Sequence, residues 1–188
     1  RLIGPAPRWT REDGGEAGLH PSNIHDNAYA VGALDLTGDM PILLGPDGPS
    51  LGGFVCPATT ASAEFWKLGQ LRPGDKLRFR LLTLEEAEAL RRQQEENLRA
   101  IGEGNSGGLA VLQLPEERPF DAGYPVLARE EANRRFPITV RCSGDRNLLV
   151  EYGEMELDLL LRFQVDALMR AIRESRDIPV LDLTPGIR

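Results

Sequence analysis

Residues 14–56 are the part of the chain richest in turn-forming residues, and they read GGEAGLHPSNIHDNAYAVGALDLTGDMPILLGPDGPSLGGFVC. It holds both histidines of the chain, His20 and His25, and nine of its 20 glycines. Glycine adopts positive φ at little cost and lets other groups approach the backbone closely. The stretch therefore predicts tight bends that line a pocket, although well-made turns in an ordinary β-rich domain explain the same composition.

Composition narrows the classes of partner. The chain has 188 residues, is 41% hydrophobic and carries a net charge of −7 without a long basic cluster, which argues against binding a nucleic-acid backbone. No apolar run reaches the length of a membrane span, and no secretory signal precedes the first strand. Cys56 and Cys142 lack metal-ligand spacing and predict buried thiols in a reducing cytoplasm. Because the chain opens on Arg1, we expect a piece of a longer polypeptide.

Short apolar runs separated by glycine and proline predict a β-barrel or sandwich in the first part of the chain. Strands are expected at 28–36, 41–44 and 54–56, and residues 61–68 suit either a short helix or a strand. Strict alternation of Leu77, Phe79 and Leu81 with basic residues predicts a further, half-buried strand.

A helix is expected to begin after Thr83, because its hydroxyl and the Glu86 carboxylate have the spacing of a capping box. It should run to about Ile101 on the surface and be followed by a flexible loop, GEGNSGG, at 102–108. Residues 83–135 are therefore interpreted as a helix and linker between two domains.

The pattern changes beyond Phe136. Two strands are expected at 137–144 and 147–153, then an amphipathic helix over 157–173 and a third strand at 178–185. This order of elements predicts an α/β unit over 136–188, whose apolar helix face covers a sheet.

Several kinds of chemistry can be weighed from the residues alone. His20 and His25 with Asp26 and Asp39 invite a metal site, but they lack helical geometry and a clear third protein ligand, so no metal is predicted. A Ser22–His20–Asp39 triad lacks the GxSxG turn that exposes a nucleophile. The glycine pairs form neither GxGxxG nor a P-loop, so nucleotide binding is not indicated here.

Four ordered blocks carry a family resemblance: HPSN, TGD, DGPSLGGFVC and KLGQLRPGD. With them, residues 5–82 resemble the C-terminal part of the carboxyltransferase domain of biotin-dependent urea carboxylase, which also occurs in urea amidolyase. The segment FPITVRCSGDRNLLVEYG and the helix and TPG that follow are similar to the start of the partner half of that domain. The related families include 5-oxoprolinase subunits and antagonists of a sporulation kinase inhibitor.

The resemblance implies an α+β fold in three parts. A β-rich, cyclophilin-like barrel portion occupies 1–82, a helix and flexible linker 83–135, and an α/β subdomain 136–188. The chain would straddle the junction of the two carboxyltransferase halves.

The resemblance also implies transfer of a carboxyl group from carboxybiotin to urea, which gives allophanate. Biotin would arrive on a separate carrier domain, and a biotin carboxylase domain would use ATP, so the isolated piece is expected to be inactive. Guanidine remains a second substrate, and a 5-oxoprolinase-type amide hydrolase or a kinase-regulating module are the alternatives. The substrate candidates are His20, Asn23, His25, Asp39 and Asp47, and Gly52 and Gly53 are the candidates near the cofactor.

Overall fold

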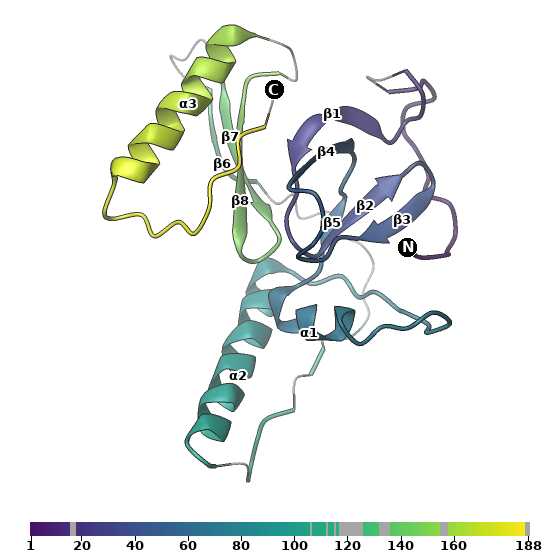
Figure 1. Cartoon of the computed structure of the whole chain (residues 1–188), viewed down its shortest axis with the longest axis vertical. Coiled ribbons are helices and arrows are strands. Elements are labelled where there is room, and N and C mark those ends of the chain that lie inside the picture. The colour runs from purple at the N-terminus through teal and green to yellow at the C-terminus, as the bar shows by residue number, and fades with distance from the viewer. Residues whose placement is uncertain are drawn as a thin grey trace.

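The chain folds into two β-containing units that meet beside a long helix (Figure 1). This computed structural model describes residues 1–15, 18–105, 107–111, 113–114, 116, 126–131, 136–154 and 158–186. The first unit contains β1 (Asn23–Ala28), β2 (Ala33–Thr37), β3 (Met40–Leu43), β4 (Leu51–Phe54), β5 (Ala58–Thr59), η1 (Ser62–Glu64) and α1 (Phe65–Leu68). The remaining elements are α2 (Leu84–Gly102), β6 (Val126–Glu130), β7 (Ile138–Ser143), β8 (Asn147–Tyr152) and α3 (Leu159–Glu174). The expected mixture of sheets and helices is confirmed.

The strands of the first unit form two small antiparallel sheets, β1–β4 and β3–β2–β5. A two-residue turn connects β2 to β3, because Thr37 pairs with Met40 and Gly38 has a φ of 64°. Positive φ in the turn matches the twist of the two strands. Among the described residues these sheets do not close into a barrel.

The predicted strand boundaries need two corrections. The expected strand at 28–36 is divided, because the chain bends between β1 and β2, where Ala33 N–H donates to Ala30 O at 3.1 Å and Gly32 has a φ of 85°. The strand expected at 54–56 is β4, which ends at Phe54. The strand at 41–44 is confirmed as β3, and 61–68 form the short helices η1 and α1.

The strand predicted from Leu77, Phe79 and Leu81 is wrong in this structure. Residues 76–82 lie in no strand, and these three side chains are 41%, 56% and 41% exposed. Alternation makes a segment two-sided, but a strand also needs a neighbouring backbone to complete its hydrogen bonds. None of the described strands pairs with this segment.

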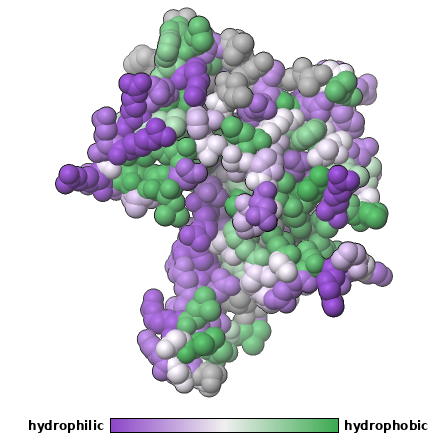
Figure 2. Space-filling model, in the orientation of Figure 1, coloured by the Kyte–Doolittle hydropathy of each residue, from purple (hydrophilic) through white to green (hydrophobic). Residues whose placement is uncertain are grey.

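Helix α2 begins where the capping box predicts. The Glu86 N–H donates to Thr83 Oγ1 at 3.2 Å, and the Thr83 N–H donates to Glu86 Oε2 at 2.7 Å. Only Ala87 and Leu90 are buried along the helix. Figure 2 shows hydrophilic surface over much of α2 and hydrophobic residues near its far end, where Leu98 and Ile101 are exposed. Within the described part of the chain, no helix is long and apolar enough to cross a membrane.

The second unit is a three-stranded antiparallel sheet, β6–β7–β8, with α3 beside it. The β7–β8 hairpin and α3 were expected, and Asp158 caps α3 by accepting from Leu160 N–H at 2.7 Å. Leu161, 4% exposed, anchors the helix close to Gly153. Strand β6 was not expected, because its sequence VLARE is short and does not alternate apolar and polar residues; four of its five residues are exposed, at the edge of the sheet. The strand predicted at 178–185 is wrong, since these residues pair with none of the described strands.

Two expectations fall partly on residues outside the described ranges. Leu157, the predicted start of the last helix, is one of them, and so is Ser106 within the predicted flexible loop. Most of the predicted linker between 112 and 135 also lies outside, apart from β6 and a few neighbouring residues.

Candidate functional site

A buried turn joins His20 to Ser22 at the entry to β1. The Ser22 N–H donates to His20 Nδ1 at 3.1 Å, and Ser22 Oγ lies 3.0 Å from the same nitrogen. The Gly38 N–H donates to Ser22 Oγ at 3.1 Å, so this hydroxyl also holds the β2–β3 turn. Because Nδ1 accepts a hydrogen bond from a backbone N–H, the proton of the neutral imidazole resides on Nε2.

The Nε2 face of His20 meets Asp39 and Trp9. Asp39 Oδ1 lies 3.7 Å from His20 Nε2 and accepts a hydrogen bond from Trp9 Nε1 at 2.9 Å. The Trp9 ring stands edge-on to the imidazole, with ring centroids 5.4 Å apart at 89°. We call Trp9, His20, Ser22 and Asp39 the His20 cluster. It brings together two of the sequence candidates, His20 and Asp39, across 18 residues of intervening sequence.

The His20 cluster contains a serine, a histidine and an aspartate in contact, but its geometry does not suit a nucleophile. Ser22 is 0% exposed, and its hydroxyl is already an acceptor for the Gly38 N–H. The imidazole nitrogen that faces it accepts from the backbone of the same serine. A hydrolytic serine needs access to a substrate carbonyl and a free base beside it. The cluster therefore fixes the start of β1 against the β2–β3 turn.

Replacing Ser22 by alanine is expected to lower the free energy of unfolding by about 1 to 2 kcal/mol, because the half-buried Gly38 N–H loses its acceptor, the hydroxyl of a fully buried serine. Guanidinium denaturation monitored by circular dichroism measures this change. Ser50→Ala, at an exposed serine of the same unit, is the matched control and should stay within about 0.5 kcal/mol of wild type. An unchanged stability for Ser22→Ala would contradict the structural role of the hydroxyl.

The other substrate candidates lie at different places. Asn23 is buried at the start of β1, and its N–H donates to His20 O at 2.9 Å, so its backbone adjoins the His20 cluster. His25 is half-buried farther along β1. Asp47 is exposed in a separate turn, closed by a hydrogen bond from Gly48 N–H to Gly45 O at 2.9 Å. Within the described residues, no hydrogen bond or ion pair is seen for the Asp47 carboxylate.

The space beside Gly52 and Gly53 is occupied by other residues of this chain. A Cβ at Gly52 would lie 2.4 Å from Tyr29 Cε2, and one at Gly53 would lie 3.0 Å from the Ile24 carbonyl oxygen. The Tyr29 hydroxyl bridges the next residue of β4, accepting from Phe54 N–H at 2.7 Å and donating to Phe54 O at 3.1 Å. The glycine pair thus lets a tyrosine ring and β1 approach β4 closely.

A second polar cluster was not anticipated from the sequence. Asp35 on β2 is only 4% exposed and accepts a hydrogen bond from Thr37 Oγ1 at 2.9 Å. Burial raises the pKa of the Cys56 thiol to about 12, and the charge of Asp35 acts in the same direction. Burial is also the main cause that raises the pKa of Tyr29, with Asp35 again contributing. The available sequence signal was a charged residue inside the apolar run ALDL, two residues before a threonine on the same face.

Two open cavities lie away from both clusters. One, of about 210 Å³, is lined by the end of α2 and by residues 105 and 107–110, and the other, of about 320 Å³, by residues between 172 and 183. Neither contains a residue of the two polar clusters. In the part of the chain that the structure describes, no three His, Cys, Asp or Glu side chains gather to hold a metal ion.

Comparison with known proteins shows that the chain is similar to carboxyltransferases. Residues 1–81 match the family model for the carboxyltransferase domain, subdomain A and B. The whole chain is 40% identical to part of the urea amidolyase of Lachancea kluyveri and 39% identical to part of that of Saccharomyces cerevisiae, covering 10% of each. It also superposes on the crystal structure of the Kluyveromyces lactis urea carboxylase with a TM-score of 0.84 and 42% identity, covering all of this chain and 16% of that one.

The chain thus spans between a tenth and a sixth of the length of the relatives compared. The match extends beyond residue 81 and includes α2, the β6–β8 sheet and α3. The resemblance drawn from the HPSN, TGD, DGPSLGGFVC and GDR blocks is confirmed.

Proposed function

We propose that this chain, which matches the carboxyltransferase region of urea carboxylase along its whole length, is the central part of a domain that transfers a carboxyl group to urea. The supporting observation is that the match is continuous across both units and the helix between them. We divide the domain at the sequence boundaries: residues 1–82 belong to a first, barrel-like half, 83–135 to a helix and linker, and 136–188 to the start of a second half. The full protein would act in the cytoplasm.

The proposed reaction needs a carboxyl donor, and carboxybiotin on a carrier domain supplies that group when it is bound. Gly52 and Gly53 do not open a space for biotin, because the space beside them is occupied by Tyr29 and β1. We therefore assign no step of the transfer to these glycines. Biotin carboxylase and carrier domains of the same protein, with ATP used by the former, would be the partners.

Urea presents N–H donors and one carbonyl acceptor, so its site needs a carboxylate and a hydrogen-bond donor. Asp47 supports the first role, because its exposed carboxylate is not used within the described structure. Asp39 is less available, since it accepts from Trp9 and faces His20. The proposed donors lie around the start of β1 and are Asn23, His20 and His25. Backbone hydrogen bonds already hold Asn23 and His20 in place.

The two alternatives are less favoured. An amide hydrolase with a serine nucleophile would need that serine to be accessible, and Ser22, which lies beside His20, is completely buried. The relatives compared are named urea amidolyase and urea carboxylase, and none of those names describes a 5-oxoprolinase or a kinase regulator.

The full-length protein that contains this sequence tests the proposal. Supplied with ATP, bicarbonate and urea, it should form allophanate, and guanidine is assayed in parallel as a second substrate. The 188-residue chain alone should form none from free carboxybiotin and urea, because the reactants are then not held together. Biotin-dependent ATP hydrolysis without any carboxylation of urea or guanidine would overturn the proposal.

Asp47→Asn in the full-length protein is expected to lower kcat/KM for urea about tenfold, because an amide places a donor against a urea N–H and leaves both groups without an acceptor. Steady-state kinetics measures the change. Asp26→Asn is the matched control, as Asp26 is an exposed carboxylate on β1 in the same stretch. Equal kcat/KM values for Asp47→Asn and wild type would leave Asp47 as a turn residue and move attention to Asn23.

A further inference from the structure

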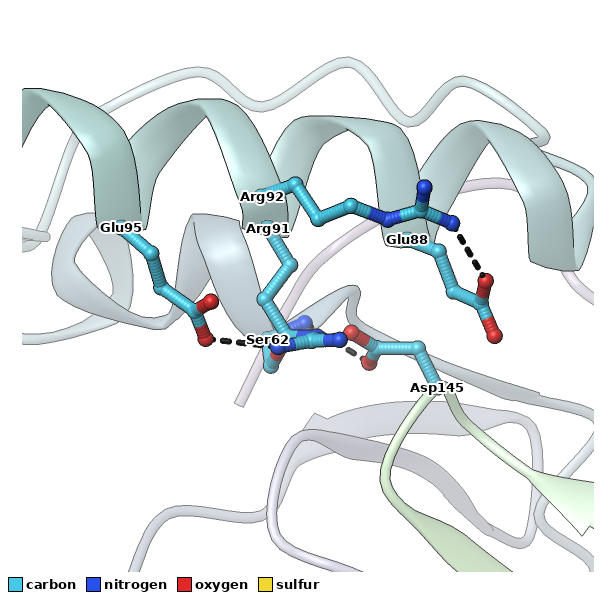
Figure 3. A network of polar contacts seen from close by, with 6 residues as sticks. All are labelled: Ser62, Glu88, Arg91, Arg92, Glu95 and Asp145. Carbon is cyan, nitrogen blue, oxygen red and sulfur yellow. Dashed lines mark hydrogen bonds and ion pairs between the residues drawn. The ribbon is translucent and has the colours of Figure 1, made fainter.

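A carboxylate of the second unit hydrogen-bonds to the first unit. Asp145, in the β7–β8 turn, accepts from the Ser62 N–H at 2.9 Å and from the Ser62 hydroxyl at 2.5 Å (Figure 3). The two residues are 83 positions apart in the chain. Because the carboxylate accepts two hydrogen bonds from one residue, both the distance between Asp145 and Ser62 and their relative orientation are restricted.

Ser62 is the first residue of η1, whose own N-cap residue, Ala61, makes no side-chain cap. The missing cap is supplied by Asp145 from the other unit. In the middle of η1, the Ala63 carbonyl oxygen accepts from the side-chain N–H of Gln94 on α2 at 3.0 Å. Two distant parts of the chain, the β7–β8 turn and α2, therefore meet at this short helix, in which Ala63 is 0% exposed.

The backbone next to Asp145 is shaped for the same contact. Gly144 has a φ of 76°, and a Cβ there would lie 2.8 Å from Thr59 Cγ2 on β5. Positive φ and close approach both require glycine at this position. Figure 3 also shows Arg91 extending from α2 toward the Ser62–Asp145 contact, while it pairs with Glu95 at 2.6 Å.

We infer that Asp145 is a positioning residue, which fixes the second unit against η1 of the first and so sets the relative placement of the two carboxyltransferase halves. The inference rests on the proposed function for its catalytic consequence, but the contact itself does not depend on it. Loss of the contact loosens the β7–β8 turn against β5 and η1 and leaves each unit folded. Carboxyl transfer needs both halves in the correct relative position, so its rate falls more than that of biotin carboxylation, which takes place in another domain.

The test uses the full-length protein with Asp145→Asn, Ser62→Ala and the double variant. We expect Asp145→Asn to accelerate amide exchange in peptides covering 59–65 about tenfold and to lower kcat/KM for urea by a similar factor. ATP-dependent carboxylation of biotin should stay within about twofold of wild type, which a general loss of folded protein would not allow. Because both substitutions weaken the same hydrogen bond, from the Ser62 hydroxyl to the Asp145 carboxylate, the double variant should be little worse than Asp145→Asn.

Asp166→Asn is the matched control, since Asp166 forms an exposed ion pair with Arg170 within α3, at 2.8 Å. It should change neither exchange at 59–65 nor urea carboxylation. Additive effects of Asp145→Asn and Ser62→Ala, or wild-type exchange in both variants, would overturn the inference. If Asp145→Asn does not fold, Ser62→Ala alone decides through exchange. A wild-type protein that carboxylates neither urea nor guanidine would refute the proposed function. Amide exchange at 59–65 would still test the Asp145–Ser62 contact independently.

Discussion

Replacing Gly52 by alanine is expected to destabilise the first unit by about 3 kcal/mol, because the new methyl group overpacks the site and breaks the hydrogen bonds of Tyr29. The Cβ would lie 2.4 Å from Tyr29 Cε2 and 2.6 Å from its hydroxyl oxygen. The ring must then rotate away, and the Phe54 N–H and C=O lose the hydroxyl that bridges them. Guanidinium denaturation, followed by circular dichroism, measures the loss.

Gly45→Ala is the matched control for this substitution. Gly45 lies in a turn of the same unit, has no positive φ and has nothing within 4 Å of an added Cβ. Its replacement should change the free energy of unfolding by less than about 0.5 kcal/mol. Combining Gly52→Ala with Tyr29→Ala should cost less than the sum of the two, since the first variant already displaces the ring. Strict additivity would show that Tyr29 does not occupy the space at Gly52.

Helix boundaries in this chain could be predicted because their signals are local. Thr83 and Glu86 form a capping box within four residues, and α2 begins where they indicate. The apolar stripe of α3 likewise lies on one element, and Leu161 is buried as a member of it. Such signals need no knowledge of the rest of the fold.

Strands were less predictable because their partners are distant in sequence. The segments 76–82 and 178–185 have strand-like patterns but no partner among the described strands, whereas β6, which lacks such a pattern, pairs with β7. The alternation of side chains indicates which face of a strand is apolar, but it does not indicate which other strand pairs with it. The barrel-like arrangement expected for residues 1–82 from the resemblance likewise depends on pairing between distant segments.

The candidate site residues were likewise predictable where the signal is local and not where it depends on distant segments. The stretch 14–56 was identified from its composition, and two of its candidates, His20 and Asp39, do meet. Their meeting depends on the β2–β3 turn and on Trp9, far outside any local motif. Asp35 escaped notice because a lone acid in an apolar strand gives no sign of burial until Thr37 is seen to hydrogen-bond with it.

The Cys56 thiol is expected to react with iodoacetamide at pH 8 about 30-fold more slowly in the folded protein than in the unfolded chain, because its thiolate is scarce, although a more basic thiolate is also a better nucleophile. Burial raises its pKa from 9.0 to about 12, and the nearby charge of Asp35 adds to the shift. The Sγ also donates to Phe54 O at 3.9 Å, a contact that only the protonated thiol can make. Cys142→Ser isolates this thiol, and mass spectrometry follows its alkylation.

The same shift makes the stability of the protein depend on alkaline pH. A thiol whose pKa is higher in the folded state contributes stability that is complete below pH 9.0 and is lost as the pH rises toward about 12. Tyr29 acts in the same direction, since burial raises its pKa as well. The free energy of unfolding should therefore fall steadily as the pH is raised above 9.0.

Cys56→Ala separates the thiol from the other groups that titrate at alkaline pH. Its free energy of unfolding, measured by denaturation at several pH values from neutral to alkaline, should fall less steeply than that of wild type, because one of the shifted groups no longer ionises. Ser50→Ala, at an exposed serine of the same unit, is the matched control and should leave the pH dependence of the wild type unchanged. Alkylation of Cys56 in the folded protein as fast as in denaturant would show that the β4 end opens readily, and the close packing of Tyr29, Asp35 and Cys56 would then not persist in solution.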